Sequence, residues 1–152
     1  LELYSQLDSK VDELDAQIKE CVRGIDPPCL SIPGVGELSA AMILSEFGDF
    51  SKFQNPSKML AFAGLEPGYF QSGQSEYTGH MVKHGSSRLR YALMNCCLPL
   101  ISNEPVFAAY YAKKRSEGKP HRVALTHVAK KLLRVIYTLQ TKNIRYDPTM
   151  IH

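Results

Sequence analysis

The sequence predicts an all-α fold: a helical domain with a coiled-coil helix at its N-terminus. Apolar residues recur at helical spacing along most of the 152 residues, and no stretch alternates apolar and polar residues convincingly as a strand would. Residues 64–90 break this pattern with five glycines and no long apolar period, so we expect a loop there. Ordering a long loop inside a helical chain costs entropy, which makes this segment a candidate for function.

The length and composition favour one globular domain with an appendage. With 44% apolar residues, the chain has enough hydrophobic surface for one core. It begins with Leu1 rather than Met, so we expect a fragment of a longer protein. No apolar run reaches the length of a membrane span, and the acidic N-terminus is unlike a signal peptide. We therefore expect a cytoplasmic protein without membrane contact.

The four cysteines predict buried thiols rather than a metal site. Cys21, Cys29, Cys96 and Cys97 show no CxxC spacing, and no paired histidines stand at zinc-ligand distances. Free cysteine is commonly a core residue, so we expect reduced, buried thiols and no bound metal.

Charge is distributed unevenly along the chain. Residues 1–76 hold five Lys/Arg against twelve Asp/Glu, a balance of −7, whereas residues 77–152 hold thirteen against three, a balance of +10. A strongly basic half is suited to a polyanionic partner such as nucleic acid. The alternative is a solvated basic face on an ordinary helical protein.

Residues 3–22 are predicted to form a helix with a narrow apolar seam. The apolar positions step by four and three residues, as in a coiled coil, with charged residues between them. They are Leu7, Val11, Leu14, Ile18 and Cys21. We therefore assign residues 1–23 to a dimerisation helix that makes the protein a homo-oligomer. The alternative is an amphipathic helix that folds back on its own domain.

Residues 27–47 resemble a helix-hairpin-helix element. After Gly24 ends the first helix, two prolines open a short one, the turn Ile32-Pro-Gly-Val-Gly36 follows, and residues 37–47 form a second helix. Gly34 and Gly36 allow a tight turn and leave amide groups at a helix N-terminus, where a nucleic-acid phosphate can bind. The alternative is a turn with only a packing role.

Two helices are expected on either side of the loop. The first covers residues 57–63 and is capped by Asn55. The second covers residues 88–101 and is capped by Ser86 or Ser87.

Two more helices complete the predicted domain. One opens at Pro105, and the last covers residues 121–141. The positions expected to be buried on the last helix are Val123, Leu125, Val128, Leu132, Leu133, Ile136 and Leu139. We expect the chain beyond Asn143 to be poorly ordered and treat residues 149–152 as a tail.

Residues within the loop and just after it are candidates for chemistry. Ser72 precedes Gly73, and a serine hydroxyl beside a glycine can approach a phosphodiester once a base or a metal removes its proton. The alternative role for Ser72 is a turn residue. Arg88 and Arg90 lie in the first turn of a predicted helix, where cations oppose the helix dipole and a bound anion would offset that cost.

Several motifs occur in the order and spacing of one protein family. They are Ile32-Pro-Gly-Val-Gly36, Ala61-Phe-Ala-Gly-Leu65 with Pro67, Ser72-Gly73, Gly79-His-Met-Val-Lys-His-Gly85, Leu89-Arg90, Gly118-Lys-Pro-His121 and Ala129-Lys-Lys-Leu132. Over residues 24–148 the chain resembles the C-terminal transposase domain of the insertion-sequence transposases related to the Piv and MooV DNA invertases, often called DEDD transposases.

This resemblance implies one part of a two-part enzyme. In such proteins an N-terminal RuvC-like domain supplies four acidic ligands for Mg²⁺, and a coiled coil joins it to the C-terminal domain. A serine of the C-terminal domain attacks DNA to form a phosphoserine link, and the matching residue here is Ser72. The resemblance also implies a structured noncoding RNA that chooses the DNA targets, and an oligomer that shares catalytic sites.

The chain departs from the family pattern because the RuvC-like domain is absent. We therefore expect no cofactor in this fragment and no recombination by it alone. The resemblance makes Lys83, Arg88 and Arg90 candidates for holding the DNA phosphate, with His84 standing where an arginine is common. Lys119 and Arg122 are weaker candidates for backbone contacts. The alternative for all of these is solvated surface charge.

The sequence is therefore compatible with three functions. The first is the serine-bearing half of a transposase that cuts and rejoins DNA. The second is a non-catalytic helix-hairpin-helix DNA-binding module, and the third is an oligomerisation module.

Overall fold

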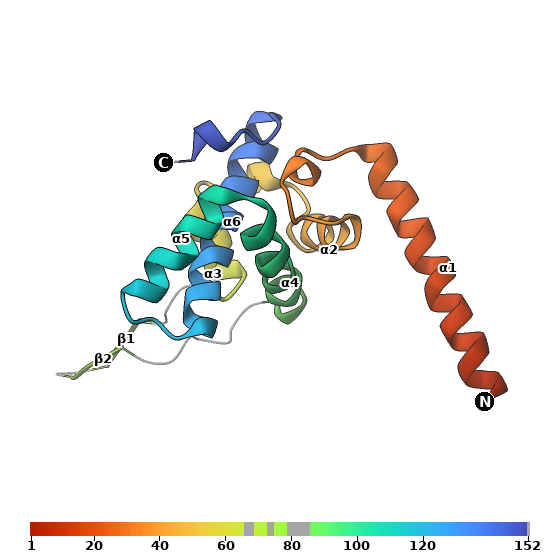
Figure 1. The fold of residues 1–152 in the computed structure, drawn as a ribbon, viewed down its shortest axis with the longest axis horizontal. Helices are drawn as coiled ribbons and strands as arrows, with labels where there is room; N and C mark the ends of the chain where they lie inside the picture. Colours follow the sequence, from red (N-terminus) through yellow and green to blue (C-terminus); the bar gives the residue numbers. More distant parts are fainter. Residues whose placement is uncertain (66–68, 73–74, 79–85, 152) are drawn as a thin grey trace.

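The computed structural model describes residues 1–65, 69–72, 75–78 and 86–151, and of residues 69–72 and 75–78 only the backbone. Figure 1 shows a helical body with one long helix extending from it. The α-helices are α1 Glu2–Ile25, α2 Glu37–Phe47, α3 Pro56–Phe62, α4 Ser87–Asn103, α5 Pro105–Ser116 and α6 His121–Lys142. Three short 3₁₀ helices are η1 Pro28–Ser31, η2 Phe50–Lys52 and η3 Pro148–Met150. The predicted all-α class is confirmed.

A two-stranded hairpin interrupts the segment that was expected to be a loop. Strands β1 (Tyr69–Ser72) and β2 (Ser75–Thr78) pair antiparallel. The expectation of no strand was therefore wrong. Both strands contain residues that favour strands, Tyr69 and Phe70 in β1 and Tyr77 and Thr78 in β2. Two residues separate the strands in the sequence, which is the spacing of a tight hairpin.

Helix α6 lies at the centre of the body and packs against α3, α4 and α5. Its buried side chains come from a broad stripe along the helix. They are Ala124, Leu125, Val128, Ala129, Leu132, Leu133, Ile136 and Leu139. Val123 was expected to join them but is 42% exposed, because it lies in the first turn and off this stripe.

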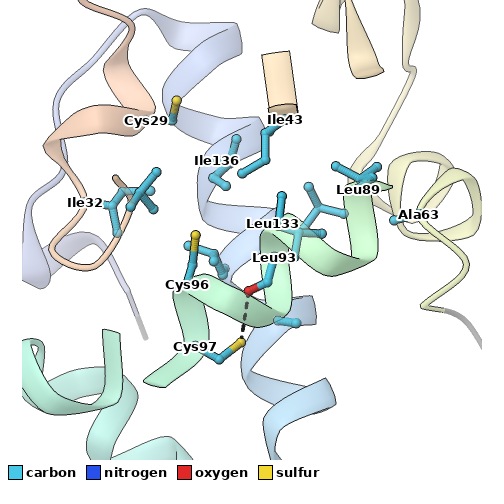
Figure 2. Close-up of a cluster of buried hydrophobic side chains, with 14 of the residues drawn as sticks. Cys29, Ile32, Ile43, Ala63, Leu89, Leu93, Cys96, Cys97, Leu133 and Ile136 are labelled. Carbon is cyan, nitrogen blue, oxygen red and sulfur yellow. Dashed lines mark hydrogen bonds between the residues drawn. The ribbon is translucent and has the colours of Figure 1, made fainter. Parts of the chain in front are cut away.

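Figure 2 shows how three segments meet in the core. Leu133 and Ile136 of α6 lie near Leu93 of α4 and Ile43 of α2. All four side chains are fully buried. The core therefore joins segments far apart in the sequence, as a single domain requires.

Three of the four thiols are buried, as predicted, and one is not. Cys29, Cys96 and Cys97 are buried and free. The Cys97 thiol donates to the carbonyl oxygen of Leu93 at 3.2 Å (Figure 2), and burial raises its pKa to about 12. Cys21 is exposed on helix α1, which buries only the neighbouring Val22.

Most helix boundaries follow the expected capping residues. The Asn55 side chain accepts from the Lys58 N–H at 3.1 Å, and Gly48 ends α2. The first helix, however, continues past Gly24 to Ile25. It ends at Asp26, which adopts the left-handed conformation with φ 47° and donates its N–H to the Val22 carbonyl.

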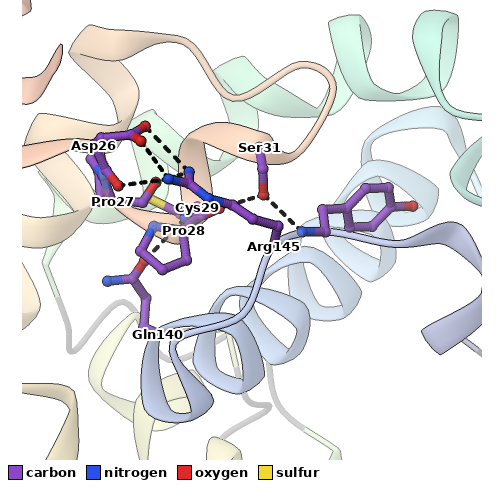
Figure 3. A network of polar contacts seen from close by, with 8 residues as sticks. Asp26, Pro27, Pro28, Cys29, Ser31, Gln140 and Arg145 are labelled. Carbon is purple, nitrogen blue, oxygen red and sulfur yellow. Dashed lines mark hydrogen bonds and ion pairs between the residues drawn. The ribbon is translucent and has the colours of Figure 1, made fainter.

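The C-terminal segment packs on the body, in contrast to the expectation of poor order after Asn143. Ile144, Tyr146 and Ile151 pack against the core. Figure 3 shows Arg145 bound to the side chain and carbonyl of Asp26. A sequence pattern could not predict these contacts, because the partners are more than 100 residues apart.

The same network fixes η1 in place. The Cys29 N–H donates to the Gln140 Oε1 at 3.0 Å (Figure 3). The Tyr146 N–H donates to Ser31 Oγ at 2.8 Å, and that hydroxyl donates to the Pro28 carbonyl at 2.6 Å. The bonds to Gln140 and Tyr146 thus attach η1 to α6 and to the C-terminal segment, and the first of them satisfies a backbone N–H of η1.

Helix α1 packs against α2 and leaves most of its own surface exposed. Val22 is its one buried residue, and the N-terminal part of the helix runs away from the body (Figure 1). The seam residues Leu7, Val11 and Leu14 are 58%, 54% and 56% exposed. The seam itself therefore does not pack on the body, although α1 contacts α2, and the coiled coil stays a prediction. No helix among the described residues is long and apolar enough to cross a membrane.

Candidate nucleic-acid interface

The two ends of the 66–85 segment lie side by side at the C-terminal end of α3. Gly64 turns the chain with φ 68°, and buried Leu65 donates its N–H to the Leu60 carbonyl at 2.9 Å. The Ser86 N–H then donates to the Phe62 carbonyl at 3.3 Å. The segment that carries Ser72 therefore leaves and re-enters the body at one place.

Ser86 connects this re-entry point to α2. Its hydroxyl donates to Oε2 of Glu46 at 2.6 Å and accepts the Leu89 N–H at 3.1 Å. The second bond is the predicted N-cap of α4. The contribution of Glu46 was missed, because a carboxylate 40 residues away gives no local sequence signal.

The two arginines of the first turn of α4 differ in their surroundings. Arg88 is exposed, whereas Arg90 is half-buried and its Nη1 donates to the Ala63 carbonyl at 3.5 Å. Arg90 thus also contacts the first end of the loop, where α3 terminates. Arg88 is the better placed of the two to reach a phosphate in solvent.

Ser72 is the last residue of β1, and its backbone pairs with that of Ser75. The hairpin projects from the helical body in Figure 1. Lys83 and His84, the other candidates from this segment, lie outside the described residues.

Gly34 and Gly36 have different environments in the turn before α2. Gly34 has φ 104°, and a Cβ placed on it would lie 2.6 Å from the backbone nitrogen of Leu100 in α4. Gly36 is exposed, caps α2, and has open space where a Cβ would stand. Gly34 thus permits close helix packing, while the N-terminus of α2 beyond Gly36 is open to an anion.

The acidic residue beside this turn is already paired. Glu37 Oε1 accepts from Nε of Arg23 at 2.8 Å, which offsets the charge that would repel a phosphate at the α2 N-terminus. The first helical element is a four-residue 3₁₀ helix, Pro28–Ser31, and so is much shorter than α2.

Helices α5 and α6 and the turn between them carry nine basic residues. They are Lys113, Lys114, Arg115, Lys119, Arg122, Lys130, Lys131, Arg134 and Lys142. Lys119 and Arg122, both predicted phosphate contacts, are exposed. Lys114 pairs with Glu117 at 3.0 Å. The remaining positive charge on this surface is suited to a polyanion.

The lysines of this surface affect the pKa of His127. Burial lowers its pKa first, and Lys114, Lys130 and Lys119 lower it further. Three ammonium groups therefore act on one imidazole without enough carboxylate to balance them. An anion bound here would relieve that repulsion.

The described residues do not form a site for the Mg²⁺ of the implied RuvC-like domain. Within residues 1–65 and 86–151 no three His, Cys, Asp or Glu side chains gather as potential ligands.

Comparisons with known proteins identify the relatives of this chain. The uncharacterized 43.6 kDa protein of insertion element IS110 from Streptomyces coelicolor is 29% identical over 90% of the chain and 34% of its own length. The uncharacterized 42 kDa protein of IS900 from Mycobacterium paratuberculosis is 30% identical over 93% of the chain and 36% of its own length. The pilin gene-inverting protein of Moraxella bovis is 29% identical over 77% of the chain and 37% of its own length.

The chain thus spans about a third of the length of these relatives. A sequence profile of the Transposase IS116/IS110/IS902 family matches residues 28–112, which include α2 to α4, the hairpin and most of α5. This match covers more than half of the chain, and the relatives cover nearly all of it. The chain belongs to the IS116/IS110/IS902 family of transposases.

Proposed function

We propose that this chain is the serine-bearing part of a transposase that cuts and rejoins DNA through a phosphoserine intermediate. The observation that carries the proposal is the position of Ser72 at the end of β1, on a hairpin that projects from a basic helical body. Family membership makes DNA the expected substrate. The attack requires the RuvC-like domain and its Mg²⁺, which belong to the full-length protein.

The proposed step exchanges one phosphate ester for another. The Ser72 oxygen bonds to phosphorus as a bond from phosphorus to a DNA oxygen breaks, and the leaving oxygen takes up a proton. The serine proton passes to a base in the completed site. A hydroxyl from a second strand then attacks the phosphoserine and releases Ser72, so no phosphate-ester bond is lost overall.

Basic residues around the hairpin hold the DNA in this proposal. Arg88 lies at the re-entry point of the loop and is exposed, and Lys119 and Arg122 extend the positive surface at the α5–α6 turn. Lys83 and His84 add to it from the loop itself. Guanidinium groups grip phosphate through two N–H donors, whereas lysines act as point charges.

Helix α1 supplies the homo-oligomer of the proposal. Its apolar seam is exposed along about three heptads, and a second copy of the helix is the partner whose seam has the same spacing. A structured guide RNA is the second nucleic acid that the basic surface would bind.

The experiment compares Ser72→Ala with Ser75→Ala in the full-length transposase that contains this chain. The two serines are paired in the hairpin register, so the control makes the same change in the same hairpin. We expect Ser72→Ala to abolish strand exchange while DNA binding persists and the Ser75→Ala variant remains active. Mass spectrometry of the trapped complex should find a nucleotide adduct on the Ser72 peptide. Unchanged exchange by Ser72→Ala would exclude it as the nucleophile.

A non-catalytic DNA-binding module is the second candidate. The open N-terminus of α2 next to Gly36 favours it, because backbone amides there bind phosphate without any chemistry. DNA binding that weakens with salt, together with strand exchange that survives Ser72→Ala, would support this candidate instead.

A further inference from the structure

We propose that a pocket between α5, α6 and the C-terminal segment holds one unstacked nucleotide of a single-stranded nucleic acid. This inference rests on the proposed function for its ligand class, and it adds a specific site to a general basic surface. The pocket is open to solvent, has a volume of about 340 Å³, and is lined by aromatic, basic and aliphatic side chains. The sequence could not indicate it, because three separate segments build it.

Tyr110 forms the aromatic wall of the pocket. The ammonium group of Lys131 lies 4.6 Å from the centroid of its ring, and that of Lys114 lies 5.5 Å from it. A base that stacks on this ring would take the place of Lys131, whose flexible side chain can follow the phosphate of the same nucleotide. Stacking of a base on an aromatic side chain contributes about 1–3 kcal/mol.

Two cations of the lining are suited to a phosphate. Lys131 is half-buried and makes no ion pair with a carboxylate of the described residues, and Arg134 on the next turn of α6 is exposed. Burial and Lys113 lower the pKa of Lys131, so this ammonium lacks the anion that would stabilise its charge. A nucleotide phosphate supplies that anion.

The C-terminal segment closes the opposite wall with Tyr146, Asp147 and Met150. Burial and the Glu104 carboxylate raise the pKa of Tyr146 to about 12, so the phenol stays neutral and adds no negative charge to the wall. Asp147 accepts the N–H and the hydroxyl of Thr149 at 2.9 and 2.8 Å, which fixes its carboxylate. The lining contains two cations, Lys131 and Arg134, and one carboxylate, Asp147, so its net charge is positive.

The volume of the pocket also limits the size of the ligand. Pockets for small ligands measure roughly 300–1,000 Å³, so this one takes a single base with its sugar. A base pair within a duplex is too large and keeps its faces stacked. The ligand is therefore a nucleotide of a single strand, from RNA or from melted DNA, and the chemistry of base and phosphate is common to both.

Photocrosslinking locates such a nucleotide directly. The probes are two single-stranded oligonucleotides of the same sequence, one DNA and one RNA, each with 5-iodouracil at one position. The 152-residue chain is irradiated with each probe, and mass spectrometry finds the crosslinked peptide. We expect crosslinks at Tyr110 or Tyr146 and none from the matching duplex. The probe that crosslinks, DNA or RNA, shows which nucleic acid supplies the nucleotide.

Matched variants test whether the pocket binds the strand. Tyr110→Leu removes the stacking surface and should weaken binding roughly tenfold in fluorescence anisotropy. Tyr91→Leu is the control, because Tyr91 is 63% exposed on α4 and outside the pocket. Arg134→Gln changes an exposed residue and so preserves the fold. It should lower affinity and the crosslink yield, whereas Arg122→Gln should lower affinity and leave the crosslink in place.

The outcomes separate this inference from the proposed function. Salt-sensitive binding with crosslinks elsewhere, and with equal affinities for Tyr110→Leu and Tyr91→Leu, would overturn the pocket and leave the basic surface intact. No binding of either strand by the chain would overturn both the pocket and the nucleic-acid surface. A crosslink at Tyr110 with full loss of strand exchange in Ser72→Ala would support both.

Discussion

The two longest helices, α1 and α6, show two fates of an amphipathic sequence. They have 24 and 22 residues, and each carries apolar residues on one face. Helix α6 buries eight residues, whereas α1 buries only Val22 and leaves its seam in solvent. Their polar faces also differ, because α1 is rich in Asp and Glu while α6 carries Lys130, Lys131 and Arg134.

The difference follows from the width of the apolar face. On α6, neighbouring apolar pairs such as Val128 with Ala129, and Leu132 with Leu133, make a stripe wide enough for several helices to cover. On α1, single apolar residues at steps of four and three make a seam wide enough for one partner helix. The periodicity of apolar residues thus predicts that one face of a helix will be covered. The width of that apolar face indicates how many elements cover it.

The largest expected effect is a cavity under α6. Leu133→Ala removes a fully buried side chain next to Leu93, and should lower the free energy of unfolding by about 2–5 kcal/mol. Leu14→Ala makes the same change on α1, where the side chain is 56% exposed, and should leave the body's stability nearly unchanged. Urea denaturation of both variants measures the contrast. Equal losses would show that α1 is part of the body's core.

The next effect is at the turn between η1 and α2. Gly34→Ala adds a Cβ 2.6 Å from the Leu100 nitrogen at a residue with φ 104°, and should cost about 1–3 kcal/mol through overpacking and strain. Gly36→Ala, two residues on, meets open space and should cost far less. Denaturation midpoints compare them. A mild Gly34→Ala together with a severe Gly36→Ala would contradict the packing role.

These contrasts also show what the sequence could predict. Helices and caps such as Asn55 and Ser86 were predictable, because the determining residues are neighbours in the chain. The Glu46 contact and the docking of Tyr146 were not, since each joins elements that only the fold brings together. The hairpin that carries Ser72 was missed, because the glycines of residues 64–90 favour a loop and the two strands among them are short.

The exposed seam of α1 should control self-association rather than folding. Leu14→Glu places a charge in the predicted helix–helix contact and should raise the dimer dissociation constant at least about tenfold, through lost apolar burial and buried charge. Ala16→Glu adds the same charge on the same helix away from the seam and should leave it unchanged. Sedimentation equilibrium measures both. A chain that is monomeric before mutation would rule out the homo-oligomer proposed for α1.

The smallest effect concerns the polar face of α6, where His127 lies among lysines. Its pKa is lowered by burial and by Lys114, Lys130 and Lys119, so the folded protein binds this proton less readily than the unfolded chain does. The associated stability is therefore present above the ordinary histidine pKa, near pH 6.5, and decreases as the pH falls below it. NMR titration should show the lowered pKa rising with added salt, because salt screens the lysines.

A bound strand should reverse this shift. Its phosphates would oppose the lysines and raise the pKa of His127, so binding takes up a proton and strengthens as the pH falls from about 8 to about 6. His127→Gln should bind with a weaker pH dependence and should lose the matching slope in stability. If the His127 pKa stays the same in the complex, the strand does not approach this part of α6. In that case the polar face of α6 would differ from that of α1 only in the sign of its charge, and no strand would lie near His127.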